Sequence, residues 1–173
     1  MKLNLGAGLD KKEGWINTDR EMDLNKLPYS YKDNSADEIL LCHVLEHLNE
    51  PTLVIAECWR ILKPNGILTV RVPWYRGIGA FADIDHRHFF YEYSMDKFLP
   101  ENNIANYETP ARFRITRKWY RYNQSKIFRL VPKFMRNFVF NKCLEINWEM
   151  LAIKDYRGMP ESKALSSMEA IKK

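Results

Sequence analysis

All four histidines of the sequence fall in two short clusters that also contain carboxylates: His43, Glu46 and His47 in the first, and Asp83, Asp85, His86 and His88 in the second. Imidazole titrates near neutral pH and therefore suits general acid–base catalysis. Imidazoles and carboxylates together also bind divalent metal ions. The sequence therefore predicts a proton-transfer or metal site where the clusters meet, although hydrogen bonding to the backbone would explain any single histidine equally well.

A glycine-rich turn lies near the start of the chain. Gly6-Ala7-Gly8 follows a strand-like stretch at 2–5, and Asp19 closes a second one at 14–19. Ligands bind at the carboxyl ends of strands in open α/β sheets, where glycines let the backbone approach them. The Asp19 carboxylate can accept hydrogen bonds from two ribose hydroxyls, and Asp23 can reach an adenine edge or an ammonium group. NAD is disfavoured because no third glycine follows, and an ordinary glycine turn remains an alternative.

The elements that must position these residues alternate between strand and helix. Strands are predicted at 2–5, 14–19, 36–42 and 67–72, with two late antiparallel strands at 112–122 and 146–153. Helices are predicted at 51–62 and from Ser94, a good N-cap. The short first crossover must be a turn or a short helix. This order predicts one layered α/β domain over residues 1–156, followed by a weakly ordered tail at 157–173.

Five stretches together resemble the small class I methyltransferases, which use S-adenosylmethionine: 3–8, 14–19, 33–37, 43–48 and 62–66. They occur in the family's order, are most similar to the type 11 and type 12 groups, and are followed by a further similar stretch at 85–90. The resemblance implies a Rossmann-like sheet, mostly parallel with an antiparallel last strand and with helices on both faces. The helices that the family usually has before the first strand are expected to be missing.

The resemblance also implies a binding site for S-adenosylmethionine. The glycine turn would pass under the methionine part and ribose, and Asp19 would hold the ribose hydroxyls. Asp23 and Leu24 would flank the adenine, while Cys42 and His43 would line the floor beside the sulfonium. The residues expected to bind the cofactor are Asn4, Leu5, Gly6, Ala7, Gly8, Asp19, Arg20, Asp23, Leu24, Cys42, His43 and Glu46.

Methyl transfer requires the acceptor to be held at attack distance and to lose its proton. The catalytic candidates are His47, His86 and His88, with a histidine of the second cluster as the base. A metal ion held by His43, Glu46, His47 and either His86 or His88 is an alternative, and this donor set favours a transition metal over Mg²⁺. Whether a metal is bound is left open.

The net charge of +5 comes from one segment, because residues 111–142 contain ten Lys/Arg and no Asp or Glu. In this basic aromatic segment, inserted before the last strand, apolar residues recur near helical spacing from Ser125 onward. Pro132 divides that stretch, so a well-formed helix is expected to begin there. It suits an anionic membrane surface, single-stranded nucleic acid or an anionic acceptor such as a nucleotide- or lipid-linked sugar. A water-facing edge helix is the plainest alternative, and exposed aromatics there also suit a homodimer.

No apolar run approaches the length of a membrane span, and the three cysteines lack metal-ligand spacing, which favours a reduced, cytoplasmic protein. The resemblance to class I methyltransferases implies an enzyme that moves a methyl group to O or N of a small-molecule or glycan-type acceptor. A nucleic-acid methyltransferase and a catalytically inactive methyltransferase-like binding protein are the alternatives.

Overall fold

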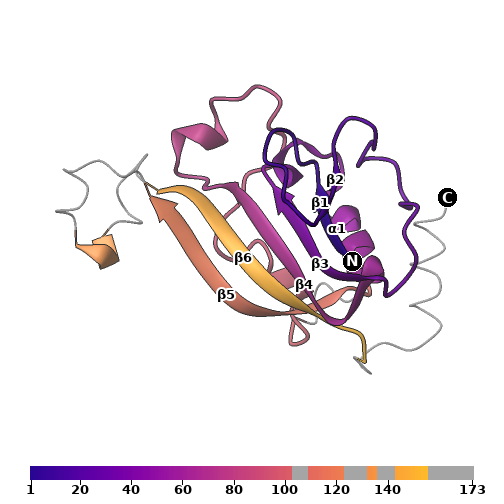
Figure 1. The fold of residues 1–173 in the computed structure, drawn as a ribbon. Helices are drawn as coiled ribbons and strands as arrows, with labels where there is room; N and C mark the ends of the chain where they lie inside the picture. The colour runs from indigo at the N-terminus through magenta and orange to yellow at the C-terminus, as the bar shows by residue number, and fades with distance from the viewer. Residues whose placement is uncertain (103–108, 123–131, 136–142, 156–173) are drawn as a thin grey trace.

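Six strands form a single sheet in the order β2-β1-β3-β4-β6-β5 (Figure 1). The computed structural model describes residues 1–102, 109–122, 132–135 and 143–155. The strands are β1 (Lys2–Leu5), β2 (Ile16–Thr18), β3 (Ala36–Cys42), β4 (Leu62–Pro73), β5 (Arg112–Tyr122) and β6 (Cys143–Ile153). Strands β1 and β3 match their predicted bounds, and the predicted strand at 67–72 forms half of β4.

The direction of each strand confirms the predicted fold class. Strands β1, β2, β3 and β4 pair in parallel, and β6 pairs antiparallel with both β4 and β5. The connection from β1 to β2 is a turn without a helix, as its length required. The start of β4 is irregular, because Asn65 takes the left-handed conformation (φ 61°) and interrupts the register with β3.

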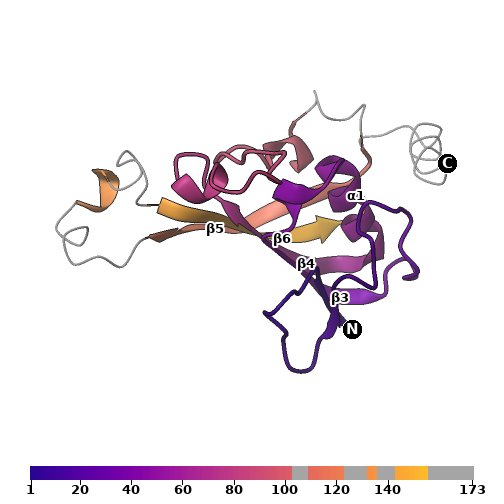
Figure 2. The same ribbon diagram turned by 90° about the horizontal axis from the view of Figure 1, so that it is seen from above.

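The layers that cover the sheet contain fewer helices than expected. In the described ranges, α1 (Pro51–Ile61) is the only α-helix, and it agrees with the prediction for 51–62. Figure 2 shows α1 and the segment after β4 on the same face of the sheet. The other helices are single 3₁₀ turns: η1 (Leu45–His47), η2 (Ile78–Ala80), η3 (Asp96–Phe98) and η5 (Lys133–Met135).

The prediction of a helix starting at Ser94 is wrong. Only η3 forms there, and the Ser94 hydroxyl accepts a hydrogen bond from the Tyr91 N–H instead of capping a helix. Leu99, which precedes Pro100, is extended (ψ 142°). A proline disfavours the helical conformation of the residue before it, so any helix would have ended within a turn.

The basic aromatic segment begins as a strand. Its first part, 112–122, is β5 at the edge of the sheet, as predicted for a late strand. The helix expected to begin at Pro132 lies mostly outside the described residues; only η5 is described there, and its Phe134 and Met135 side chains are exposed. The tail at 157–173 also lies outside the described residues. No helix in the described ranges is long and apolar enough to cross a membrane.

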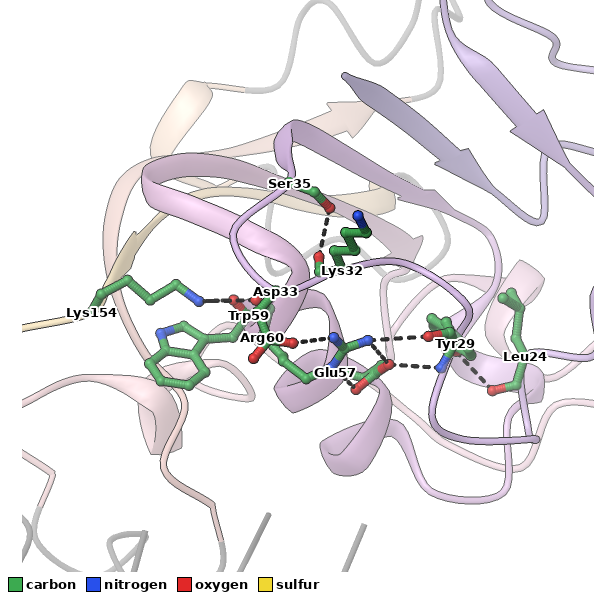
Figure 3. A network of polar contacts seen from close by, with 9 residues as sticks. All are labelled: Leu24, Tyr29, Lys32, Asp33, Ser35, Glu57, Trp59, Arg60 and Lys154. Carbon is green, nitrogen blue, oxygen red and sulfur yellow. Dashed lines mark hydrogen bonds and ion pairs between the residues drawn. The ribbon is translucent and has the colours of Figure 1, made fainter. Parts of the chain in front are cut away.

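A buried ionic network fixes α1 to the loop that follows β2 (Figure 3). The Glu57 carboxylate is fully buried, and Arg60 donates to its two oxygens at 2.8 and 2.6 Å. The Tyr29 N–H also donates to Glu57 (2.7 Å), while Arg60 pairs with Asp33. The Tyr29 hydroxyl donates to the carbonyl of Leu24 (2.8 Å). The network therefore anchors the segment that carries Asp23 and Leu24.

Replacing Glu57 tests this anchor. Glu57→Gln should lower the free energy of unfolding by about 3 kcal/mol, because it removes the buried counter-ion of the largely buried Arg60 guanidinium and leaves only the exposed Asp33 carboxylate as its partner. Urea unfolding followed by circular dichroism measures the loss. The control is Glu38→Gln, which breaks the more exposed pair with Lys2 and should cost less than about 1 kcal/mol. Equal losses in the two variants would contradict the assignment.

Candidate active site

The glycine turn after β1 is held open by its backbone geometry. Gly6 and Gly8 have positive φ (68° and 51°), and the Ala7 N–H donates to the carbonyl of Thr18 at 2.7 Å. A Cβ on Gly6 would lie 2.7 Å from Val44 Cγ2, whereas a Cβ on Gly8 would meet no heavy atom within 4 Å. Gly6 is therefore required by packing, and Gly8 leaves open space at the carboxyl end of β1.

Two amides support this turn from below. Asn4 is buried, and its side chain donates to the Asp10 carbonyl (2.8 Å) and to Asn17 Oδ1 (2.9 Å). The Asn17 amide also holds both the N–H and the carbonyl of Lys12. Asn4 and the fully buried Leu5, both expected to bind the cofactor, therefore have side chains that shape the turn. The sequence analysis missed Asn17, whose signal was a polar residue inside a short strand.

The acidic residues after β2 lie at the same edge of the sheet. Asp19, Arg20 and Asp23 have exposed side chains. Asp23 accepts a hydrogen bond from the Asn25 N–H (3.0 Å), which stabilises the turn that it begins. Leu24 is buried beside Gly6, so its side chain belongs to the floor below the glycine turn. Cys42, at the end of β3, is half-buried.

His43 is the central ionisable group of the site. It follows β3 in the left-handed conformation (φ 55°), and its side chain is 42% exposed. Nδ1 lies 3.2 Å from Glu46, and Nε2 lies 2.9 Å from Glu145, which also pairs with Arg121. Hydrogen bonds with Glu145 and then Glu46 raise the pKa of His43 to about 9, against the effect of burial. His43 is therefore a cation at neutral pH.

Glu145 is the counterpart of His43. Burial raises the pKa of its carboxyl, but hydrogen bonds from His43 and Arg121 outweigh that effect and bring the pKa to about 2. Neither Glu145 nor Arg121 was among the site residues expected from the sequence. Strand pairing late in the chain brings both residues to the site, because Arg121 on β5 lies opposite Glu145 on β6. No local motif marks either residue.

A cleft of about 640 Å³ opens next to His43. Its lining comes from the ends of β3 and β4, the segment after β4, and strands β5 and β6: His43, Pro73, Gly79, Ala82, Asp83, Ile84, His86, Arg121, Leu144 and Glu145. Strand β3 lies between β1 and β4. His43 therefore separates the glycine turn on the β1 side from the cleft on the β4 side.

The structure brings the two histidine clusters together. The backbone N–H groups of Arg87 and His88 donate to the carbonyl of Glu46, at 2.8 and 3.3 Å. The rings of His47 and His86 are 4.6 Å apart in an edge-to-face arrangement. Of the three catalytic candidates, only His86 lines the cleft, while the side chains of His47 and His88 are half-buried outside its lining.

Comparison with known proteins agrees with this geometry. The sheet is that of class I methyltransferases: it superposes on an S-adenosylmethionine-dependent methyltransferase from Mesorhizobium loti with a TM-score of 0.57 at 9% identity, over 87% of this chain and 89% of that one. One from Archaeoglobus fulgidus gives 0.55 at 14%, over 87% and 85%. Residues 7–70 match the type 11 methyltransferase domain family, which confirms the resemblance.

The comparisons define the fold more closely than the reaction. The [4+2]-cyclase SpnF also matches, with a TM-score of 0.55 at 15% identity over 88% of this chain and 75% of that one. No curated protein matches the sequence. One fold supports several chemistries, so the reaction has to be argued from the site.

The interaction between His43 and Glu145 predicts a measurable titration. In Glu145→Gln, the pKa of His43 should fall from about 9 toward 6.5, because the strongest of its two hydrogen-bond partners loses its charge. NMR titration of the imidazole in chelator-treated buffer measures it. The control, Arg121→Met, removes a cation from the same network and should leave the pKa of His43 raised. A His43 pKa that stays near 9 in Glu145→Gln would refute the pairing.

Proposed function

We propose that this protein is an S-adenosylmethionine-dependent methyltransferase that acts on an oxygen or nitrogen of a small-molecule or glycan-type acceptor. The observation that carries the proposal is the position of His43, with the open glycine turn on one side and the cleft on the other. A methyl donor and an acceptor bound on the two sides would meet at the end of β3.

The residues on the β1 side fit the cofactor. The space above Gly8 is free, and the Asp19 carboxylate is exposed at the end of the neighbouring strand. When bound, S-adenosylmethionine would supply an electrophilic methyl group on a sulfonium. The chain would hold the ribose through Asp19, and Gly6 to Gly8 would let the backbone lie close to the ligand. Because His43 is a cation, it does not suit the role of base. It would instead orient the methyl donor and the acceptor where they meet at the end of β3.

The cleft fits an acceptor that is partly apolar. Gly79, Ala82, Ile84 and Leu144 contribute small or apolar surface, whereas His86 and Arg121 contribute polar groups. His86 Nδ1 lies 3.0 Å from the carbonyl of Ala80, so Nδ1 carries a proton, and in the neutral imidazole Nε2 then carries the lone pair. This lone pair can accept a hydrogen bond or a proton from the acceptor, which narrows the predicted histidine base to His86.

A nucleic-acid acceptor is the second candidate. The exposed side chains of Arg114, Arg117 and Lys118 on β5 favour it, and Arg117 lies over the ring of Trp119 (4.7 Å). However, β5 is an edge strand, and exposed cations on edge strands also prevent pairing with other chains. The small-molecule proposal is therefore preferred. Homodimerisation and membrane contact through 125–142 stay predictions, and the free cysteines support a cytoplasmic location.

Cofactor binding is tested by calorimetry with S-adenosylhomocysteine. Wild type should bind, and Asp19→Ala should bind roughly 10–100-fold more weakly, because it loses charge-assisted hydrogen bonds to the ribose. The control is Asp155→Ala. This exposed carboxylate follows β6, at the end of the sheet opposite the carboxyl ends of β1 and β2. If wild type shows no heat at millimolar ligand, the protein is better explained as a catalytically inactive methyltransferase-like binding protein.

The acceptor is tested with radiolabelled cofactor across small-molecule, glycan, RNA and DNA substrates. Gly79 lines the cleft, and a Cβ there meets no heavy atom within 4 Å. Gly79→Leu should therefore fold, bind S-adenosylhomocysteine normally and lose methyl transfer roughly 100-fold, as expected for a displaced acceptor. Unchanged transfer would show that the acceptor binds elsewhere. RNA or DNA binding that weakens steeply with salt would favour the second candidate.

A further inference from the structure

Beside the cleft, one carboxylate and two imidazoles converge. Glu46, His47 and His86 each present one potential ligand atom, and these three atoms all lie within 4.8 Å of one another. The three residues come from two segments that the Glu46 carbonyl joins, since it accepts hydrogen bonds from the backbone N–H groups of Arg87 and His88. The grouping is therefore fixed by the backbone and does not depend on side-chain rotamers alone.

The Glu46 side chain has an unexplained feature. It is only 1% exposed; its Oε1 faces His43, but among the described residues no hydrogen-bond donor reaches Oε2. A buried carboxylate oxygen without a donor costs free energy of the order of 1–3 kcal/mol or more. A metal cation would be a suitable partner for this oxygen. His47 and His86 could bind the same ion through unprotonated ring nitrogens.

The tautomer of His86 is already set for metal binding. Its Nδ1–H donates to the carbonyl of Ala80 (3.0 Å), so in the neutral ring the lone pair is on Nε2. A metal-bound histidine typically donates its other ring N–H to a backbone carbonyl or a carboxylate, which fixes the ring and increases its basicity as a ligand. His43 supports Glu46 in the same way, through its contact with Oε1 (3.2 Å).

We propose that Glu46, His47 and His86 bind a divalent transition-metal ion at the edge of the cleft. Two imidazoles and one carboxylate favour Zn²⁺, Co²⁺ or Mn²⁺ over Mg²⁺, which prefers oxygen ligands. The set differs from the sequence hypothesis, because His43 is turned to Glu145 and His88 lies outside the group. Three protein ligands leave coordination positions open to the cleft that His86 lines.

The ion would change the part that His86 plays in the proposed function. In the loaded protein His86 is a ligand, so it does not act as the base. An acceptor hydroxyl on an open coordination position would lose its proton more easily, because the ion lowers the pKa of a bound oxygen. The binding of the ion itself does not depend on methyl transfer, so a negative result with S-adenosylhomocysteine would leave the metal proposal standing.

The test is a titration of the untagged, chelator-treated full chain with Co²⁺, followed by visible absorption and by thermal unfolding. Wild type should bind one equivalent, show new absorption bands and unfold at a higher temperature. His86→Ala and Glu46→Gln should each bind Co²⁺ at least about 10–100-fold more weakly. His88→Ala, on the same segment but outside the group, should bind as wild type does.

Four results would overturn the proposal. Wild type that binds no stoichiometric Co²⁺ has no such site, and tighter binding of Mg²⁺ than of Co²⁺ contradicts the donor set. His86→Ala with wild-type affinity removes His86 from the ligands, and a loss in His88→Ala equal to that in His86→Ala moves the site away from this group. Circular dichroism of each metal-free variant reports whether the fold is retained, so unfolding is not mistaken for loss of a ligand.

Discussion

The burial of the Glu57 carboxylate against Arg60 is the interaction on which the glycine-turn side of the molecule depends. Residues 19–35 contain no helix or strand, yet they carry the acidic groups proposed to hold the ribose. A charge without solvent is tolerated only where partners surround it. The contacts among Glu57, Arg60, Tyr29 and Asp33 therefore hold this loop against α1 (Figure 3). The loop is thus ordered by electrostatics in place of secondary structure.

The second half of the site depends on a similar arrangement around His43. Its left-handed backbone ends β3 abruptly and directs the imidazole between Glu46 and Glu145. The same Glu46 side chain leaves Oε2 for the proposed metal. His43 therefore connects the glycine turn, the cleft and the histidine pair, and a change in its charge would alter the electrostatics of all three.

Local patterns in the sequence predicted the parallel part of the sheet well, because apolar runs and turn residues such as Gly6 define short strands directly. The helix expected at Ser94 was wrong, since Pro100 limits it to one turn. The sequence did not identify Glu145 and Arg121 as site residues, because their position in the site depends on antiparallel pairing of β6 with β4 and β5. Such register follows from tertiary contacts and leaves no motif in either segment.

The long separation between His43 and Glu145 has a consequence for biosynthesis. The two residues are 102 positions apart, and the cleft also draws on Arg121 and Leu144. On the ribosome, β1 to β4 emerge well before β6, so the half of the sheet with the glycine turn can fold while the cleft still lacks one wall. Until β6 inserts, the edge of β4 and its buried face are exposed, and a nascent chain stalled at that stage is open to pairing with other chains.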